Sequence, residues 1–197
     1  MSVGSIVLAG GRSSRFGKEK HSEVISGKSI IERVLDRVRS VSDETLLVIS
    51  RRQSETAFSY PGVKTVFDLY PNKGALGGIY TGLVYSGHPR NLVVACDMPF
   101  LNGDLLGYMI DLAVGFDIVI PRVGEHTEPL HAVYSDGCVG PMEKQLKEGD
   151  LRIAHVFDRV RVRYVEEQEL DAFDPDHVSF FNVNTGKDLD RARAMLE

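Results

Sequence analysis

The chain has 197 residues, of which 43% are hydrophobic and 26% charged, a composition typical of a folded globular protein rather than of a disordered segment. Its 28 acidic and 23 basic residues give a net charge of −5, which argues against a nucleic-acid or membrane-surface binder. The two cysteines lie far apart in the sequence, so neither a disulfide framework nor a structural zinc site is indicated. No apolar run has the length of a signal peptide or of a membrane span. Both observations favour a cytoplasmic protein.

Six short runs rich in β-branched residues predict strands along the chain. They are SIVLA (5–9), TLLVIS (45–50), VKTVF (63–67), NLVVAC (91–96), FDIVIP (116–121) and VRVRYVE (160–166). Most of these runs are apolar without a break, which is typical of strands that are covered on both faces. They therefore favour a largely parallel sheet.

Helical patterns separate these runs. We expect a helix after a Ser29 and Glu32 capping box, a second begun by Asn102, and a third that begins after Pro141 and stops near Gly149. A last helix is expected from about Lys187, with Thr185 as its candidate cap. Strands that alternate with helices predict a single α/β domain over residues 1–197, a three-layer α/β/α sandwich with a mostly parallel, Rossmann-like sheet. In such a sheet the ligand binds at the carboxyl ends of the strands.

The first strand leads into LAGGRSSRFGKEK, residues 8–20. Gly10 and Gly11 can turn the chain and leave N–H groups facing an anion, Arg15 can clasp phosphate oxygens through its planar fork, and Lys20 offers a compact charge. We interpret the loop as a binding site for a nucleoside triphosphate. The spacing fits neither a Walker loop nor the dinucleotide fingerprint, and a solvated surface turn is the alternative.

An acidic residue follows the fourth predicted strand, in VVACDMPF. Asp97 stands where that strand emerges at the ligand edge, and such a carboxylate can hold Mg²⁺ together with water and substrate phosphate oxygens. A lone Asp in this position is also a common turn or cap residue.

Glycines are concentrated in YPNKGALGGIYTGL, residues 70–83. They indicate that the backbone approaches a base, a ribose or a neighbouring helix closely, with Gly77 as a candidate nucleotide contact. Asp68, at the end of the preceding strand, could face a sugar, a base or the metal, or could be an ordinary turn residue.

Two further patterns lie near the carboxyl terminus. In FFNVNTGKDL, Asn182 and Asn184 alternate with apolar residues, so on a strand both amides would face a ligand or a metal-bound water. Alternatively, they satisfy backbone groups before the last helix.

We expect His131 to be a hydrogen-bonded core or rim residue rather than a metal ligand. The arginines 152, 159, 161 and 163 form either a solvated strand, which we favour, or an acceptor-phosphate surface.

Five of these stretches, in this order, resemble the molybdenum cofactor guanylyltransferase family of the nucleotide-diphospho-sugar transferase fold. They are LAGGRSSRFGKEK, GALGGI, CDMPF, EPLHAVY and NVNTGKDL. The resemblance implies transfer of GMP from GTP to the terminal phosphate of molybdopterin or the molybdenum cofactor, with release of pyrophosphate and with Mg²⁺ as cofactor. It also admits cofactor-delivery or acceptor proteins as partners, and no nucleic acid or membrane.

The resemblance also implies roles for individual residues. Lys20, Arg15, Asp97, Asn182 and Asn184 would be catalytic, with Asp97 on the metal, and the nucleotide would contact Leu8, Ala9, Gly10, Gly11, Lys20, Ser50, Asp68, Gly77 and Asp97. Ser50 departs from an asparagine often found there, and Glu128 from a glutamine. Other enzymes of this fold stay open as alternatives, namely an adenosylcobinamide-phosphate guanylyltransferase or a cytidylyltransferase. A GTP-binding regulatory module without enzymatic activity also stays open as an alternative.

Overall fold

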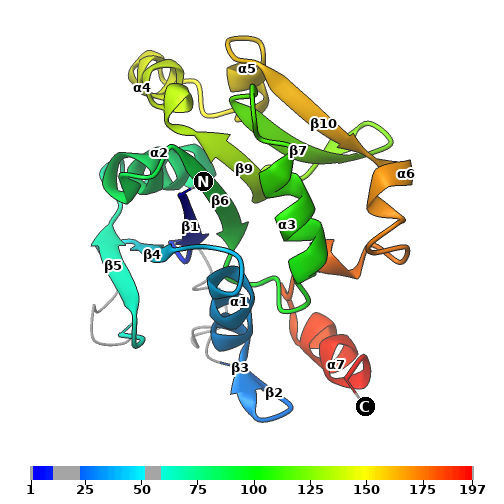
Figure 1. Cartoon of the computed structure of the whole chain (residues 1–197). Helices are drawn as coiled ribbons and strands as arrows, with labels where there is room; N and C mark the ends of the chain where they lie inside the picture. Colours follow the sequence, from blue (N-terminus) through cyan, green and yellow to red (C-terminus); the bar gives the residue numbers. More distant parts are fainter. Residues whose placement is uncertain (1, 11–22, 52–58, 197) are drawn as a thin grey trace.

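The computed structural model describes residues 2–10, 23–51 and 59–196, and a sheet with helices on both faces organises them (Figure 1). All six predicted strands are confirmed. The order across the sheet is β10 (Val162–Glu166), β7 (Ile118–Val123), β9 (His131–Ser135), β6 (Arg90–Ala95), β1 (Val3–Leu8), β4 (Glu44–Ile49) and β5 (Val63–Phe67), and β8 (His126–Thr127) pairs with β7.

The sheet is mostly parallel, as predicted, with one reversed strand in its interior. Strand β1 runs parallel to β4 and β6, β4 to β5, and β7 to β10, whereas β9 is antiparallel to both β6 and β7. The reversal arises because β7 turns back through a tight connection at Gly124 (φ 57°) into β8 instead of crossing over through a helix. Strand β9 apart, all strands along this path (β10, β7, β6, β1, β4 and β5) therefore have their carboxyl ends at the same edge of the sheet.

The helices form the two outer layers. Helices α1 (Ile30–Arg39) and α3 (Gly103–Asp111) pack into one core cluster, and α2 (Gly74–Ser86), α4 (Val139–Glu148) and α5 (Ala154–Phe157) pack into the other. The remaining elements are the hairpin β2 (Val24–Ile25) and β3 (Lys28–Ser29), the short helices η4 (Asp136–Cys138), α6 (Glu167–Leu170) and η5 (Val178–Phe180), and α7 (Gly186–Ala194). No helix in the described ranges is long and apolar enough to cross a membrane.

The predicted helix ends are largely confirmed. Ser29 and Glu32 form a capping box, Asn102 accepts hydrogen bonds at the start of α3, and Thr185 caps α7. One boundary was wrong, since α4 begins two residues before Pro141. A proline in the first turn needs no intrahelical N–H partner, so it does not have to mark the first residue of the helix.

The glycine-rich stretch forms helix α2, and two of its glycines let the helix lie close to strand β1. A Cβ atom at Gly82 would lie 2.3 Å from Cγ2 of Ile6, and one at Gly78 would lie 3.3 Å from a methyl group of Leu8. The packing interpretation therefore applies at these two positions, although the neighbour is strand β1 and not a helix, because any side chain would push α2 away from the sheet.

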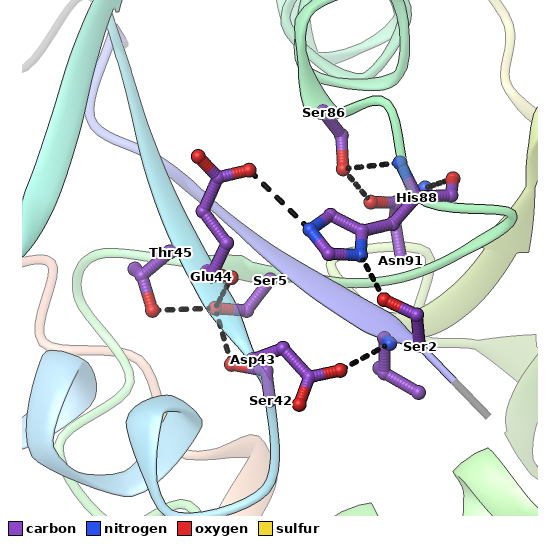
Figure 2. A network of polar contacts seen from close by, with 10 residues as sticks. Ser2, Ser5, Ser42, Asp43, Glu44, Thr45, Ser86, His88 and Asn91 are labelled. Atoms are coloured by element: carbon purple, nitrogen blue, oxygen red, sulfur yellow. Dashed lines mark hydrogen bonds and ion pairs between the residues drawn. The ribbon is translucent and has the colours of Figure 1, made fainter.

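A polar network occupies the opposite, amino-terminal edge of the sheet (Figure 2). Ser5 Oγ lies 2.9 Å from Thr45 Oγ1, and the Ser42 hydroxyl donates to Ser5 Oγ at 3.0 Å. The Val3 N–H donates to Asp43 at 2.9 Å, and this bond lowers the pKa of that carboxyl. The network joins β1 to β4 at the end that faces away from the predicted ligand edge.

Candidate active site at the carboxyl edge of the sheet

Four neighbouring strands carry the predicted nucleotide contacts at their carboxyl ends. In spatial order the contacts are Asp68 after β5, Ser50 after β4, Leu8 to Gly10 at the end of β1, and Asp97 after β6. Backbone hydrogen bonds continue the pairing past the strands: the N–H of Asp68 donates to Ile49 O at 2.8 Å, that of Ala9 to Val48 O at 2.9 Å, and that of Cys96 to Leu8 O at 3.1 Å. The candidate residues therefore form one row along the edge.

Gly10 lies at the centre of this row and is exposed. A Cβ atom there would lie 3.5 Å from the backbone nitrogen of Ser50, so the backbones at the ends of β1 and β4 run side by side. Gly10 is not among the glycines with a positive φ. Its turn consequently does not use the left-handed conformation, and a Cβ atom there would make only ordinary van der Waals contact, so nothing among the described residues requires a glycine at this position.

Asp68 is held in a defined position by its surroundings. Asp68 as a whole is 9% exposed, and its Oδ1 atom accepts a hydrogen bond from the Tyr70 N–H at 2.9 Å. The same oxygen lies 3.0 Å from the hydroxyl of Thr81 on α2. The turn bond is the one expected of an aspartate that ends a strand, whereas the contact with α2 comes from a residue that sequence reasoning did not select.

Gly77 lies in the first turns of α2 and faces the loop that follows Asp68. A Cβ atom on Gly77 would lie 2.9 Å from the carbonyl oxygen of Tyr70 and 3.1 Å from Cβ of Lys73. Loop and helix therefore touch through their backbones at this point. Gly77 belongs to the surroundings of Asp68, and its direct contact with a nucleotide stays a prediction.

Asn182 and Asn184 lie next to Asp97, although not on a strand. The residue between them, Val183, donates its backbone N–H to Asp97 O at 2.9 Å. Residues 181–184 have no regular secondary structure, so the expected alternation on a strand was wrong; the apolar side chains there pack into a small cluster with α7 instead of into a sheet face. Asn182 donates its side-chain amide to Phe180 O at 3.0 Å, and Asn184 is exposed.

The donor set around Asp97 suits one class of metal ion. Among the residues that the structure describes, no group of three or more His, Cys, Asp and Glu side chains could hold a metal. A single carboxylate at a strand end fits a hard divalent ion, which completes its coordination with water and phosphate oxygens. Desolvation raises the pKa of the neighbouring Cys96 thiol far above its usual range, so this thiol is protonated near pH 7.

His131 is a core residue, as expected, but its expected hydrogen bonds are missing among the described residues. The side chain is 0% exposed, and neither ring nitrogen has a hydrogen-bond partner there. The ring packs edge-on against Phe180, with the centroids 4.8 Å apart. Burial lowers the pKa of the imidazole to about 4, so His131 is neutral near pH 7.

The described structure pairs each of the four arginines near β10 with a carboxylate. The pairs are Arg152 with Asp150, Arg159 with Glu148, Arg161 with Asp117, and Arg163 with Glu169, at distances of 2.6 to 3.4 Å. This arrangement agrees with a solvated charged surface. It gives no support to an acceptor-phosphate site there, since each guanidinium already faces an acidic group.

Three predicted phosphate contacts lie outside the described residues. They are Gly11, Arg15 and Lys20, all in the segment that joins β1 to the β2–β3 hairpin. The described ends of this segment are Gly10, in the row of candidate contacts, and Glu23, which precedes β2. The roles of the three residues stay predictions.

Comparison with known proteins assigns the family. Residues 5–164 match the model of the MobA-like NTP transferase domain. The chain belongs to this family. A probable molybdenum cofactor guanylyltransferase of Pelotomaculum thermopropionicum is 40% identical to this chain over 192 residues. The match covers 98% of this chain and 92% of that relative. The chain is 39% identical to the molybdenum cofactor guanylyltransferase of Desulfosudis oleivorans, over 99% of this chain and 96% of that relative.

A solved MobA-like structure has the same architecture. Molybdopterin-guanine dinucleotide biosynthesis protein A from Archaeoglobus fulgidus superposes with a TM-score of 0.84 at 31% identity, and the match covers 98% of both chains. The resemblance carried by the five sequence stretches is confirmed, as is the α/β fold. The MobA-like chain is accordingly a nucleotidyltransferase.

Proposed function

We propose that this protein transfers GMP from GTP to the terminal phosphate of molybdopterin or of the molybdenum cofactor and releases pyrophosphate. The observation that carries the proposal is the row of Asp68, Ser50, Gly10 and Asp97 on four adjacent strand ends in a chain of the MobA-like family. A nucleotide laid along this row has its base at one end and its phosphates at the other.

The phosphate end lies at Asp97. Strands β5 and β6 are separated by β1 and β4, so Asp68 and Asp97 follow strands about 14 Å apart, three times the usual spacing of neighbouring strands. Two carboxylates that far apart cannot bind the same ion, whose ligands lie at about 2.1 Å. Asp97 therefore takes the metal role and Asp68 the nucleoside role.

The chemistry is an in-line displacement at the α-phosphorus. An oxygen of the acceptor phosphate forms the new P–O bond, and the bond to the bridging oxygen of the β-phosphate breaks, so that the electron pair leaves with pyrophosphate. The acceptor phosphate is already an anion, and no general base is needed. The protein has to bring two polyanions together and stabilise the charge on the leaving oxygens, a role that we assign to Lys20, Arg15 and the N–H groups of Gly10 and Gly11.

Mg²⁺ at Asp97 would supply positive charge next to the reacting phosphates when it is bound. Asn182 and Asn184 flank the residue that is hydrogen-bonded to Asp97. They lie at the reaction end of the row, where their amides can orient the acceptor phosphate. GTP and the molybdopterin acceptor are thus the small-molecule partners, and a protein that delivers the acceptor is a further candidate partner.

Pyrophosphate release tests the function directly. The purified protein should release pyrophosphate from GTP, and much less from CTP, only when molybdopterin and Mg²⁺ are both present. Release with CTP instead, or with another phosphorylated acceptor alone, would assign the protein to a different transferase of this fold. Nucleotide binding without release under any acceptor would make it a binding module and contradict the proposal.

A matched pair of variants tests the metal role. Asp97→Asn keeps the size of the side chain but removes its charge, and we expect it to lose Mg²⁺-dependent turnover while the melting temperature changes little. Asp104→Asn changes an exposed aspartate in the first turn of α3 and should keep full turnover. Near-normal turnover of the Asp97 variant would remove this residue from the metal site.

A further inference from the structure

Thr81 lies behind the proposed nucleotide contact Asp68 and is 0% exposed. Its Oγ1 atom accepts a hydrogen bond from the Leu69 N–H at 3.0 Å. The same atom lies 3.0 Å from Asp68 Oδ1 and 2.8 Å from the carbonyl oxygen of Gly77, one turn earlier in α2. One hydroxyl group thus joins the aspartate, the loop after it and the helix.

These contacts restrict the Asp68 carboxylate. Its Oδ1 atom is engaged by the Tyr70 N–H and by Thr81, and the two donors approach from the loop and from the helix. A carboxylate held by two donors on one oxygen has a fixed rotamer. Its other oxygen then points in a defined direction, ready to accept a hydrogen bond.

The hydroxyl hydrogen of Thr81 has two acceptors within reach, Asp68 Oδ1 and Gly77 O. A threonine in a helix often donates to the carbonyl four residues earlier without any role in a site. Here, however, the hydroxyl oxygen also accepts from Leu69 N–H, and this bond ties the backbone next to Asp68 to α2. Both the side chain and the backbone of the loop therefore depend on Thr81.

We infer that Thr81 is a positioning residue for nucleotide recognition: it orients the Asp68 carboxylate toward hydrogen-bond donors at the nucleoside end of GTP. This inference rests on the proposed function, because it requires a nucleotide along the row of strand ends. The donors are N–H groups of the guanine or hydroxyls of the ribose. Asp68 is too far from Asp97 for a role at the phosphates, as the strand spacing indicates.

Thr81→Val tests the inference, since valine has nearly the shape of threonine but no hydroxyl. We expect its KM for GTP to rise about 5- to 20-fold with kcat within twofold of the wild type, because Asp68 keeps its charge and its bond from Tyr70 N–H, so only part of the value of a hydrogen bond to a charged group is lost. Thr81→Ser keeps the hydroxyl and should restore KM. When Asp68→Asn is already present, adding Thr81→Val should raise the KM for GTP no further.

Thr45→Val is the matched control. Thr45 is 2% exposed and its hydroxyl contacts Ser5 at the opposite edge of the sheet (Figure 2). It should lose a similar amount of stability and keep the wild-type KM. An unchanged KM in Thr81→Val, or an equal rise in Thr45→Val, would overturn the inference.

Two nucleotide analogues identify the donors. Inosine triphosphate lacks the 2-amino group of guanine, and 2′-deoxyGTP lacks one ribose hydroxyl. If Asp68 contacts the base, Thr81→Val should weaken the preference for GTP over inosine triphosphate; if it contacts the sugar, the preference over 2′-deoxyGTP should weaken. A wild-type protein that releases no pyrophosphate from any nucleotide would refute the proposed function itself, whereas an active wild type with unchanged Thr81→Val kinetics would refute the inference alone.

Discussion

The backbone N–H of Val183 donates a hydrogen bond to the carbonyl oxygen of Asp97 across 2.9 Å. The Val183 side chain is 3% exposed and packs with Ile25, Ile30 and Ala192. This cluster joins the hairpin that follows the predicted phosphate loop to the last helix of the chain. It therefore connects residues 25 and 30 with the carboxyl-terminal segment that carries the predicted catalytic residues Asn182 and Asn184.

Val183→Ala should lower kcat more than its loss of stability explains. Two methyl groups are removed, and the segment that carries Asn182 and Asn184 loses its anchor; at about 0.8 kcal/mol per buried carbon, with a cavity in addition, the variant should be roughly 2 kcal/mol less stable. Val156→Ala in α5 is the control, because Val156 is likewise buried, at 0% exposed. Equal kcat values for the two variants, measured well below their melting temperatures, would contradict a link between this cluster and catalysis.

Lys20→Ala should lower kcat by a factor on the order of 10² to 10³, the usual effect of removing one group that stabilises charge in the transition state. Steady-state pyrophosphate release measures it. Lys28→Ala is a suitable control because Lys28 pairs with Asp36 at the surface, 2.6 Å away. A loss confined to KM for GTP would make Lys20 a binding residue only.

Gly82→Ala should destabilise the protein by about 1 to 3 kcal/mol, because the new Cβ atom would lie 2.3 Å from Ile6 Cγ2 and overpack the contact of α2 with β1. Gly107→Ala provides the opposite case. Gly107 lies in α3, and in the described part of the chain no atom beyond its sequence neighbours and its own helix backbone lies within 4 Å of the added carbon, so alanine should stabilise the helix by about 0.5 to 1 kcal/mol. Urea denaturation of both variants compares the two effects.

The free energy of unfolding should fall as the pH falls from about 6.5 toward 4. Burial lowers the pKa of His131 from its ordinary value of 6.5 to about 4 in the folded protein, so between these values the unfolded chain binds a proton that the native state does not. The stabilising contribution is complete above the unfolded pKa and is lost as the pH approaches the folded one.

His131→Leu isolates this contribution, because leucine fills the apolar site and does not titrate. The slope of the unfolding free energy against pH, measured by urea denaturation near pH 5.5, should decrease by up to about 1.4 kcal/mol per pH unit, which corresponds to one proton. An unchanged slope would mean that other groups dominate acid unfolding. His126→Leu, at an exposed position of β8, should leave the slope nearly as it is.

The order of strands and helices could be predicted from the sequence because it depends on local chemistry. Continuous β-branched runs predicted all six strands, and the cap residues Ser29, Asn102 and Thr185 predicted the starts of three helices. The phosphate loop and Asp97 could be selected for the same reason, since a strand followed by glycines and cations, or by an aspartate, is a local pattern. These features need no knowledge of which residues meet in space.

Pairings between distant segments depend on the packing of the whole chain. Strand β9 runs against its neighbours because a hairpin replaces a crossover helix, and the glycines of α2 serve a helix-to-sheet contact that no short stretch of sequence reveals. Likewise, Thr81 reaches Asp68 and Val183 reaches Asp97 only after folding, across 13 and 86 residues. Composition and short patterns determined the elements and the candidate chemistry. Tertiary structure decided which side chains hold that chemistry in place, because hydrogen bonds and van der Waals contacts act over a few ångströms in space, whatever the separation along the chain.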